Sequence, residues 1–124
     1  MALPSISALG ALRAQRHALW LNALKQRLQE LVASERHRAS PLFQVFLFGS
    51  RARGDWDGYS DTDLFVVADD PQVAEHLARR HLGAGLAQDV VAMSSSRWEA
   101  QHTFPSPYWR SVKSDALPLH RHLP

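Results

Sequence analysis

The sequence predicts one domain of the α/β (α+β) class, with a small mixed sheet flanked by helices. Three observations lead there: the chain has 124 residues, helical and strand-like segments alternate along it, and the link between the first two strands is short. A length of 124 residues corresponds to a single domain over 1–124, since a second core would need more residues than remain. A short link permits antiparallel pairing or a small helical turn, so we expect a mixed sheet and not a purely parallel one.

The composition excludes several classes of protein. Hydrophobic residues make up 45% and charged residues 21%, as in packed globular domains, and a net charge of +2 gives no strong footprint for nucleic acid, although it does not rule such a partner out. The absence of cysteine excludes disulfides and thiolate sites and fits the reducing cytoplasm, which is the expected location. No apolar run reaches the ~18 residues of a membrane span, and Met1–Leu12 lacks the pattern of a signal peptide.

The first expected element is a long amphipathic helix over about residues 9–33. Its apolar stripe consists of residues three or four apart: Ala14, His17, Leu21, Leu24, Leu28 and Leu31. His17 is expected to lie at the edge of the core and not to bind a ligand. The charged stretch Ser34–Pro41 ends the helix and serves as a linker.

Strands and helices then alternate. The apolar run Phe43–Phe48 predicts a buried strand that stops at Gly49, and Asp61–Ala68 predicts a second strand after a polar, turn-rich stretch. Pro71 suits the first position of a helix that reaches about Leu82, with Asp70 as its N-cap and Gly83 or Gly85 at its end.

The remaining elements are shorter. Gln88–Met93 predicts a third strand, and the serines at 94–96 can cap a helix that reaches about His102. One more short helix is expected near Tyr108–Ser114, followed by an extended, solvated end that includes His120–His122.

A glycine-containing loop, Gly49–Gly54 (GSRARG), follows the first strand directly. Glycines let the backbone approach a ligand closely, Ser50 can cap a following turn, and free N–H groups at such a turn bind phosphate. The loop is no Walker A motif, because Asp55 and Trp56 stand where that motif requires Lys and Ser or Thr. Taken alone, it fits a plain connection equally well.

Three aspartates give the loop a chemical context. Asp61 and Asp63 are two apart in the expected second strand, so the pleat sends both carboxylates to one face with Cβ atoms about 7 Å apart. Such a pair is tolerated when a cation lies between the charges or water surrounds them, and oxygen ligands suit Mg²⁺. Asp89 begins the third strand and can join them if that strand pairs beside the second, forming the three-carboxylate cluster of two-metal phosphoryl chemistry.

These residues together resemble the motif of the DNA polymerase beta nucleotidyltransferase superfamily. The similarity rests on four features together. They are the loop 49–54, the ten residues between Ser50 and Asp61, the Asp61-Thr62-Asp63-Leu64 motif with the apolar run after it, and a third acid in Asp89-Val90-Val91. It covers about residues 43–119, including the stretch SPYWRSVKSDALPL, and is closest to the minimal nucleotidyltransferases. The resemblance implies a palm-type fold with its catalytic core over that range; the N-terminal helix is compatible with it but adds nothing.

The resemblance also implies a role for each residue. Gly49 and Ser50 would hold the triphosphate of ATP, Asp61 and Asp63 would bind two Mg²⁺ ions, and Asp89 would bind one of them and help activate the acceptor hydroxyl. Attack on the α-phosphorus would release pyrophosphate. Arg51 and Arg53 would neutralise phosphates or, equally, be plain surface charges.

The sequence departs from the family pattern in DWDGY at 55–59, where Trp56 and Tyr59 suit local packing or a partner surface better than base stacking. The later aromatics are expected in the core or an interface: Trp98, Phe104, Tyr108 and Trp109.

Three functions remain open after the sequence alone. In minimal members of the family the acceptor is often a tyrosine of a HEPN-type toxin, so the resemblance implies a protein adenylyltransferase that acts as an antitoxin. A chain of 124 residues has little room to recognise an acceptor, which favours a partner. The alternatives are a non-catalytic antitoxin that neutralises its partner by binding, which an intact set of three acids disfavours, and a small-molecule nucleotidyltransferase.

Overall fold

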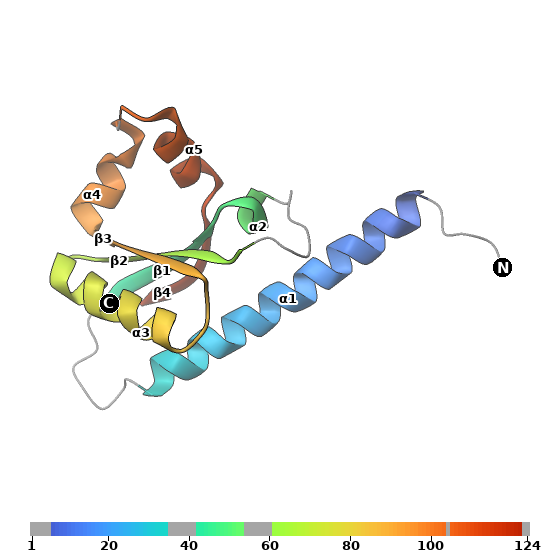
Figure 1. The fold of residues 1–124 in the computed structure, drawn as a ribbon, viewed down its shortest axis with the longest axis horizontal. Helices are drawn as coiled ribbons and strands as arrows, with labels where there is room; N and C mark the ends of the chain where they lie inside the picture. The colour runs from blue at the N-terminus through green and yellow to red at the C-terminus, as the bar shows by residue number, and fades with distance from the viewer. Residues whose placement is uncertain (1–5, 35–41, 54–60, 104, 123–124) are drawn as a thin grey trace.

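The computed structural model describes residues 6–34, 42–53, 61–103 and 105–122. Figure 1 shows a four-stranded sheet with helices on both faces. The described elements, in chain order, are α1 (Ile6–Ser34), β1 (Phe43–Phe48), α2 (Ser50–Arg53), β2 (Asp63–Ala68), α3 (Pro71–Gly83), β3 (Asp89–Ser94), α4 (Ser95–Glu99), the 3₁₀ turn η1 (Ala100–Thr103), α5 (Pro107–Asp115) and β4 (Leu117–His122).

The sheet is mixed, as predicted, with the strand order β3-β2-β1-β4. β1 pairs antiparallel with β2 and with β4, and β2 pairs in parallel with β3. The parallel pair is joined through α3, which is the crossover that such a pair requires. Because β1 and β2 run in opposite directions, the end of β1 lies beside the start of β2, and β3 begins at the same edge of the sheet.

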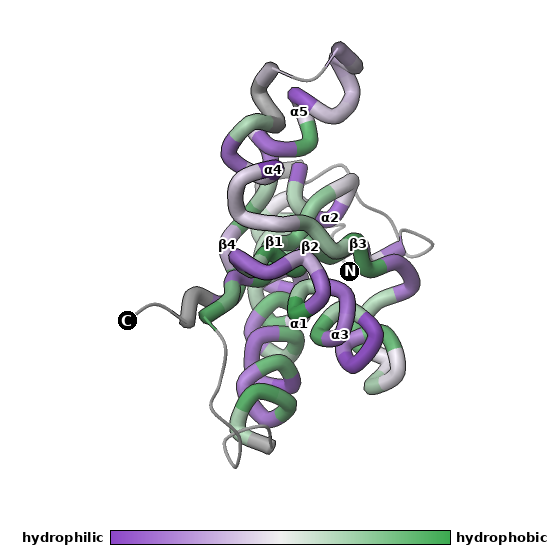
Figure 2. Tube along the Cα trace, turned by 90° about the vertical axis from the view of Figure 1, so that its left-hand side faces the viewer, coloured by the Kyte–Doolittle hydropathy of each residue, from purple (hydrophilic) through white to green (hydrophobic). Residues whose placement is uncertain are grey.

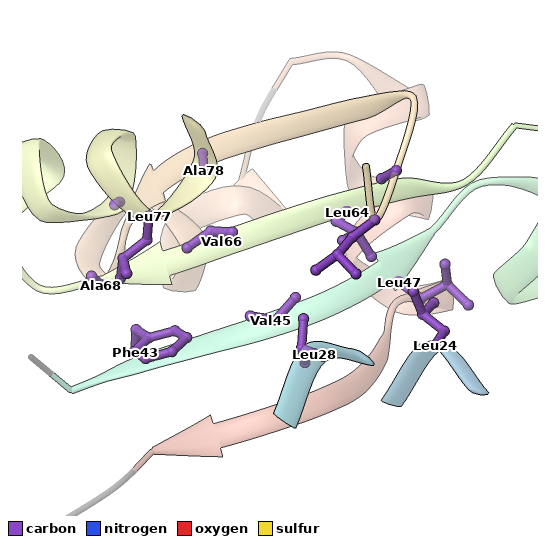
Figure 3. Close-up of a cluster of buried hydrophobic side chains, with 13 residues drawn as sticks. Leu24, Leu28, Phe43, Val45, Leu47, Leu64, Val66, Ala68, Leu77 and Ala78 are labelled. Atoms are coloured by element: carbon purple, nitrogen blue, oxygen red, sulfur yellow. The ribbon is translucent and has the colours of Figure 1, made fainter. Parts of the chain in front are cut away.

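Alternation along the strands divides the core into two layers. One face of the sheet packs against α1 and α3, and the side chains of this layer include Leu24, Leu28, Val45, Leu64 and Leu77 (Figure 3). The other face packs against α4 and α5 through a cluster of mostly aromatic residues: Phe46, Phe48, Phe65, Val67, Met93, Trp98 and Val112. β1 and β2 are buried along almost their whole length, as expected of strands covered on both faces. Along α1, hydrophobic and hydrophilic segments alternate (Figure 2).

Helix α1 packs on the sheet through its C-terminal half. Leu24 and Leu28 are buried, and Leu21 and Leu31 pack against the same cluster, so this part of the predicted apolar stripe faces the core, whereas Ala14 is exposed. The N-terminal half runs past the sheet in Figure 1 and leaves Leu9, Leu12 and Leu19 exposed. None of the helices in the described ranges is both long enough and apolar enough to cross a membrane.

Several predicted boundaries need correction. β2 begins at Asp63 and not at Asp61, and β3 covers 89–94 and not 88–93. Just before the ladder starts, the Thr62 N–H donates to the Gln88 side chain and not to a main-chain carbonyl. The helix expected to reach about His102 ends at Glu99 and tightens into η1.

The C-terminal segment also differs from the prediction. The end of the chain was expected to be extended, with His120–His122 as a solvated tail, but residues 117–122 form edge strand β4 beside β1, and the ring of His120 lies 4.9 Å from that of Phe43. Pro118 is tolerated because an edge strand leaves one row of main-chain groups unpaired.

Candidate active site

The predicted site residues gather where three elements meet at one edge of the sheet. Gly49 follows the last residue of β1, Asp63 is the first residue of β2, and Asp89 is the first residue of β3. Phe48 is the Cα partner of Asp63 in the antiparallel ladder, and Asp63 is the partner of Asp89 in the parallel ladder. The fold thus brings together residues separated by up to forty positions in the sequence.

Gly49 lies directly against the Asp63 carboxylate. It has φ +79°, in the left-handed region that favours glycine, and a Cβ built on it would lie 2.7 Å from Asp63 Oδ2. Real Cβ atoms do not approach an oxygen so closely. Glycine is therefore required here for two reasons, the backbone conformation and the room that the carboxylate needs.

Asp63 and Asp89 lie side by side on the same face of the sheet. Paired residues on neighbouring strands share a face, and the odd-numbered residues that follow, Phe65 and Met93, pack in the layer under α4 and α5. Partial burial raises the pKa of Asp63 above its ordinary value, and the charges of Asp89 and Asp61 raise it further. Asp61 and Asp89 therefore both act electrostatically on Asp63.

Asp61 stands before the strand, not in it. It is exposed, whereas Thr62 between the two acids is buried. The Thr62 N–H donates to Gln88 Oε1 at 2.7 Å, and the Thr62 carbonyl accepts from the main-chain N–H of Gln88 at 3.0 Å and of Asp89 at 3.4 Å. The segment that carries Asp61 and Asp63 is thus tied to the segment that carries Asp89.

The glycine loop opens as one helical turn, α2. The N–H groups of Ala52 and Arg53 donate to the Gly49 carbonyl at 3.1 Å each, so Ser50 is the first residue of the turn. The Arg51 guanidinium lies 4.6 Å from the centre of the Trp20 ring on α1, and Arg53 is exposed. The structure therefore places Arg51 against α1, a contact that the sequence analysis did not anticipate.

His17 stacks on the same Trp20 ring, with 5.6 Å between ring centroids and planes 17° apart. Desolvation lowers the pKa of His17, and the positive charges of Arg51 and Arg13 lower it further. Its position beside α2 and its lowered pKa agree with a histidine at the edge of the packed structure, as predicted.

The donor chemistry at this edge suits a hard cation. Aspartate oxygens are the ligands that Mg²⁺ prefers, and a cation would relieve the repulsion that raises the pKa of Asp63. Across the described ranges, no three His, Cys, Asp or Glu side chains converge closely enough to form a ready metal cluster. The assignment of Asp61, Asp63 and Asp89 as metal ligands therefore stays a prediction.

Two hollows lie near β3, at its opposite ends. A pocket of about 250 Å³ adjoins the acid-bearing segments and is lined by residues that include Trp20, Arg27, Thr62 and Gln88. A groove of about 570 Å³ lies at the far end of the strand, against Met93, Ser94 and Trp109. Only the smaller one touches the segment between Asp61 and Asp63.

With this geometry described, comparison with known proteins identifies the family. The family model "Nucleotidyltransferase domain" matches residues 22–97, well over half of the chain. The chain belongs to the nucleotidyltransferase domain family. The matched range contains Gly49, Asp61, Asp63 and Asp89, and it also takes in the C-terminal half of α1.

The nucleotidyltransferase also resembles a solved structure. The crystal structure of a "putative nucleotidyltransferase" from Sulfolobus solfataricus matches with a TM-score of 0.53 at 20% identity, covering 88% of this chain and 86% of the other. This likeness confirms the predicted fold class of a mixed sheet with flanking helices. None of the curated proteins matches the chain.

Two residues that contact the segments of the candidate site, Trp20 and Gln88, were not predicted from the sequence. Trp20 stands three residues after His17, so the two side chains share one side of the helix, although the predicted stripe did not include Trp20. Gln88 carries no such signal, since its partner is 26 positions away. The aromatics Trp56, Tyr59 and Phe104 lie outside the described residues. Of the other late aromatics, Trp98 is buried as expected, and Tyr108 is exposed.

Proposed function

We propose that this nucleotidyltransferase transfers AMP from ATP to a hydroxyl group, with a tyrosine of a HEPN-type toxin as the acceptor, and thereby acts as an antitoxin. One observation carries the enzymatic part. Gly49 has a left-handed backbone conformation and no side chain, so it leaves room for the Asp63 carboxylate, and Asp89 is the partner of Asp63 in the parallel ladder. The glycine-containing loop therefore lies next to paired acids, which supports a role of the loop in binding phosphate. The choice of ATP and of a toxin tyrosine is supported by the resemblance to minimal nucleotidyltransferases.

In this proposal each residue has a defined task. Asp61, Asp63 and Asp89 would hold Mg²⁺, which when bound supplies positive charge beside the attacking and leaving oxygens. Gly49 and Ser50 would position the triphosphate, since Gly49 brings the main chain against Asp63 without a side chain between them. Asp89 would accept the proton of the attacking hydroxyl, whose oxygen bonds to the α-phosphorus as pyrophosphate leaves. Catalysis then depends mainly on position and charge.

The test is to supply purified protein with α-labelled ATP, Mg²⁺ and the product of the neighbouring gene. The double variant Asp61→Asn with Asp63→Asn removes two charges at the site. A matched control, Asp69→Asn with Glu75→Gln, removes two exposed charges from the far end of β2 and from α3. We expect label on the neighbour with the wild type and the control, and none with the site variant.

Growth of cells that express both genes provides the second readout. If the site variant relieves toxicity as well as the wild type does, and no label is transferred by either, the enzymatic proposal is wrong and the protein neutralises its partner by binding. If small hydroxyl compounds take the label and the partner does not, the acceptor part of the proposal is wrong.

A further inference from the structure

We propose that Gln88 is a positioning residue of this site, and that its side chain fixes the main chain between Asp61 and Asp63 relative to Asp89. The inference rests on the proposed function, because it assigns to Gln88 a task in holding the acids. Gln88 itself touches neither phosphate loop nor carboxylate in any contact that the structure gives. It acts through Thr62.

Gln88 engages both polar main-chain groups of Thr62. Its Oε1 accepts the Thr62 N–H at 2.7 Å, and its own main-chain N–H donates to the Thr62 carbonyl at 3.0 Å. Thr62 is buried, so an unpaired N–H there would be costly. A single residue therefore satisfies the peptide groups on both sides of Thr62, and each of these groups adjoins a candidate metal ligand.

The Gln88 side chain takes the place of a main-chain hydrogen bond that the β2–β3 ladder lacks at this position. β2 begins at Asp63 and β3 at Asp89, so the regular parallel pairing stops one residue short of Thr62 and Gln88. Beyond that point, main-chain pairing alone would leave Thr62 N–H without its strand partner. The amide of Gln88 supplies an oxygen at that place and extends the β2–β3 connection towards Asp61.

Repulsion between the acids makes a hydrogen-bonded connection of this kind necessary. Asp89 is the partner of Asp63 in the parallel ladder and Asp61 stands two residues before Asp63, so like charges gather here and repel when they are ionised. Asp61 stands outside the strand and has no ladder bond to resist that repulsion. Partners behind metal ligands commonly change metal affinity by 10–100-fold when they are removed, because they fix the ligands before the ion arrives.

The experiment compares Gln88→Met, which keeps the length of the side chain but removes the oxygen, with Gln88→Glu, which keeps an oxygen. Gln72→Met is the matched control, since Gln72 is exposed on α3. In the labelled-ATP assay we expect Gln88→Met to raise the Mg²⁺ concentration for half-maximal rate about tenfold. At saturating Mg²⁺ the KM for ATP should stay close to that of the wild type. Gln88→Glu should restore most of the Mg²⁺ response, and Gln72→Met should behave as the wild type.

Two measurements need no turnover. Hydrogen exchange at the Thr62 amide should accelerate in Gln88→Met and slow again in Gln88→Glu, and Mn²⁺ binding should weaken in Gln88→Met alone. Should Gln88→Met fail to fold, Gln88→Ala takes its place in every assay. An unchanged Mg²⁺ response and unchanged Mn²⁺ binding in a folded variant overturn the role of Gln88. A wild type that binds Mn²⁺ but transfers no label overturns the proposed function, while the exchange and Mn²⁺ data still decide the role of Gln88.

Discussion

The contact between Gly49 and Asp63 gives the sharpest prediction at the scale of single residues. Replacing Gly49 by Ala puts a Cβ 2.7 Å from Asp63 Oδ2 and forces a left-handed φ on a residue that disfavours it. We expect a loss of about 1–2 kcal/mol in the free energy of unfolding. Nucleotidyl transfer should fall on the order of 100-fold, because the carboxylate must move. Urea denaturation and the labelled-ATP assay measure the two effects.

Gly83→Ala is the matched control for that substitution. Gly83 ends α3, and a Cβ there would meet nothing within 4 Å. Its stability and activity should equal those of the wild type. Equal losses in both variants would show that Gly49 has no special role.

The pKa of Asp63 leads to a second prediction at this scale. Burial and the charges of Asp89 and Asp61 raise this pKa, so the ionised carboxylate destabilises the folded state at pH values above the raised pKa. Asp63→Asn should therefore unfold at a higher temperature than the wild type at pH 7 without metal. The advantage should shrink as the pH falls through the raised pKa and vanish below the ordinary aspartate pKa. A variant that melts lower at pH 7 would contradict this explanation.

At the scale of elements, the contact between Arg51 and Trp20 ties the turn α2 to helix α1. The guanidinium lies 4.6 Å from the ring centre, within the range of a cation–π interaction. Trp20→Ala should lower the free energy of unfolding by about 1–3 kcal/mol, since it removes both packing and this interaction. The KM for ATP should rise several-fold because α2 carries Ser50, one of the residues proposed to hold the triphosphate.

Two variants distinguish a role of Trp20 in positioning α2 from a role in packing alone. Trp20→Phe keeps an aromatic face and should retain most of the ATP affinity, and Leu19→Ala alters the exposed neighbour and should change neither quantity. If Trp20→Ala loses stability but keeps the KM of the wild type, Trp20 supports the fold without positioning α2.

For the whole molecule, the spacing of apolar residues and the positions of proline, glycine and capping residues predicted most of the helices and strands. The apolar run Phe43–Phe48 and the Asp70-Pro71 start of α3 are local signals with which the structure agrees, and the C-terminal part of the helical stripe of α1 also faces the core. β4 was missed because Pro118 and the polar residues after it argue against a strand, and only its pairing with β1 makes it one. Strand pairing is a tertiary effect that no window of the sequence contains.

The residues of the candidate site also divide into those that local motifs predicted and those that only contacts between distant segments bring together. The motif joined Gly49, Asp61 and Asp63, and the expectation that Asp89 would pair beside the second strand agrees with the observed register. The roles of Gln88 and Trp20 depend on contacts between distant segments, so spacing alone could not predict them. Arg51 was expected at a phosphate or in solvent; its guanidinium lies over the Trp20 ring, a contact that was not predicted, and its role at a phosphate stays a prediction.

In the proposed reaction the nucleoside monophosphate of ATP moves to the acceptor. Parallel reactions with α-labelled and γ-labelled ATP, Mg²⁺ and the product of the neighbouring gene test it most directly. We predict that the α-label appears on the partner protein and that the γ-label is released as pyrophosphate, in the wild type but not in the Asp61→Asn, Asp63→Asn double variant. Transfer of the γ-label to the partner, or α-label transfer that survives the double variant, would contradict the account.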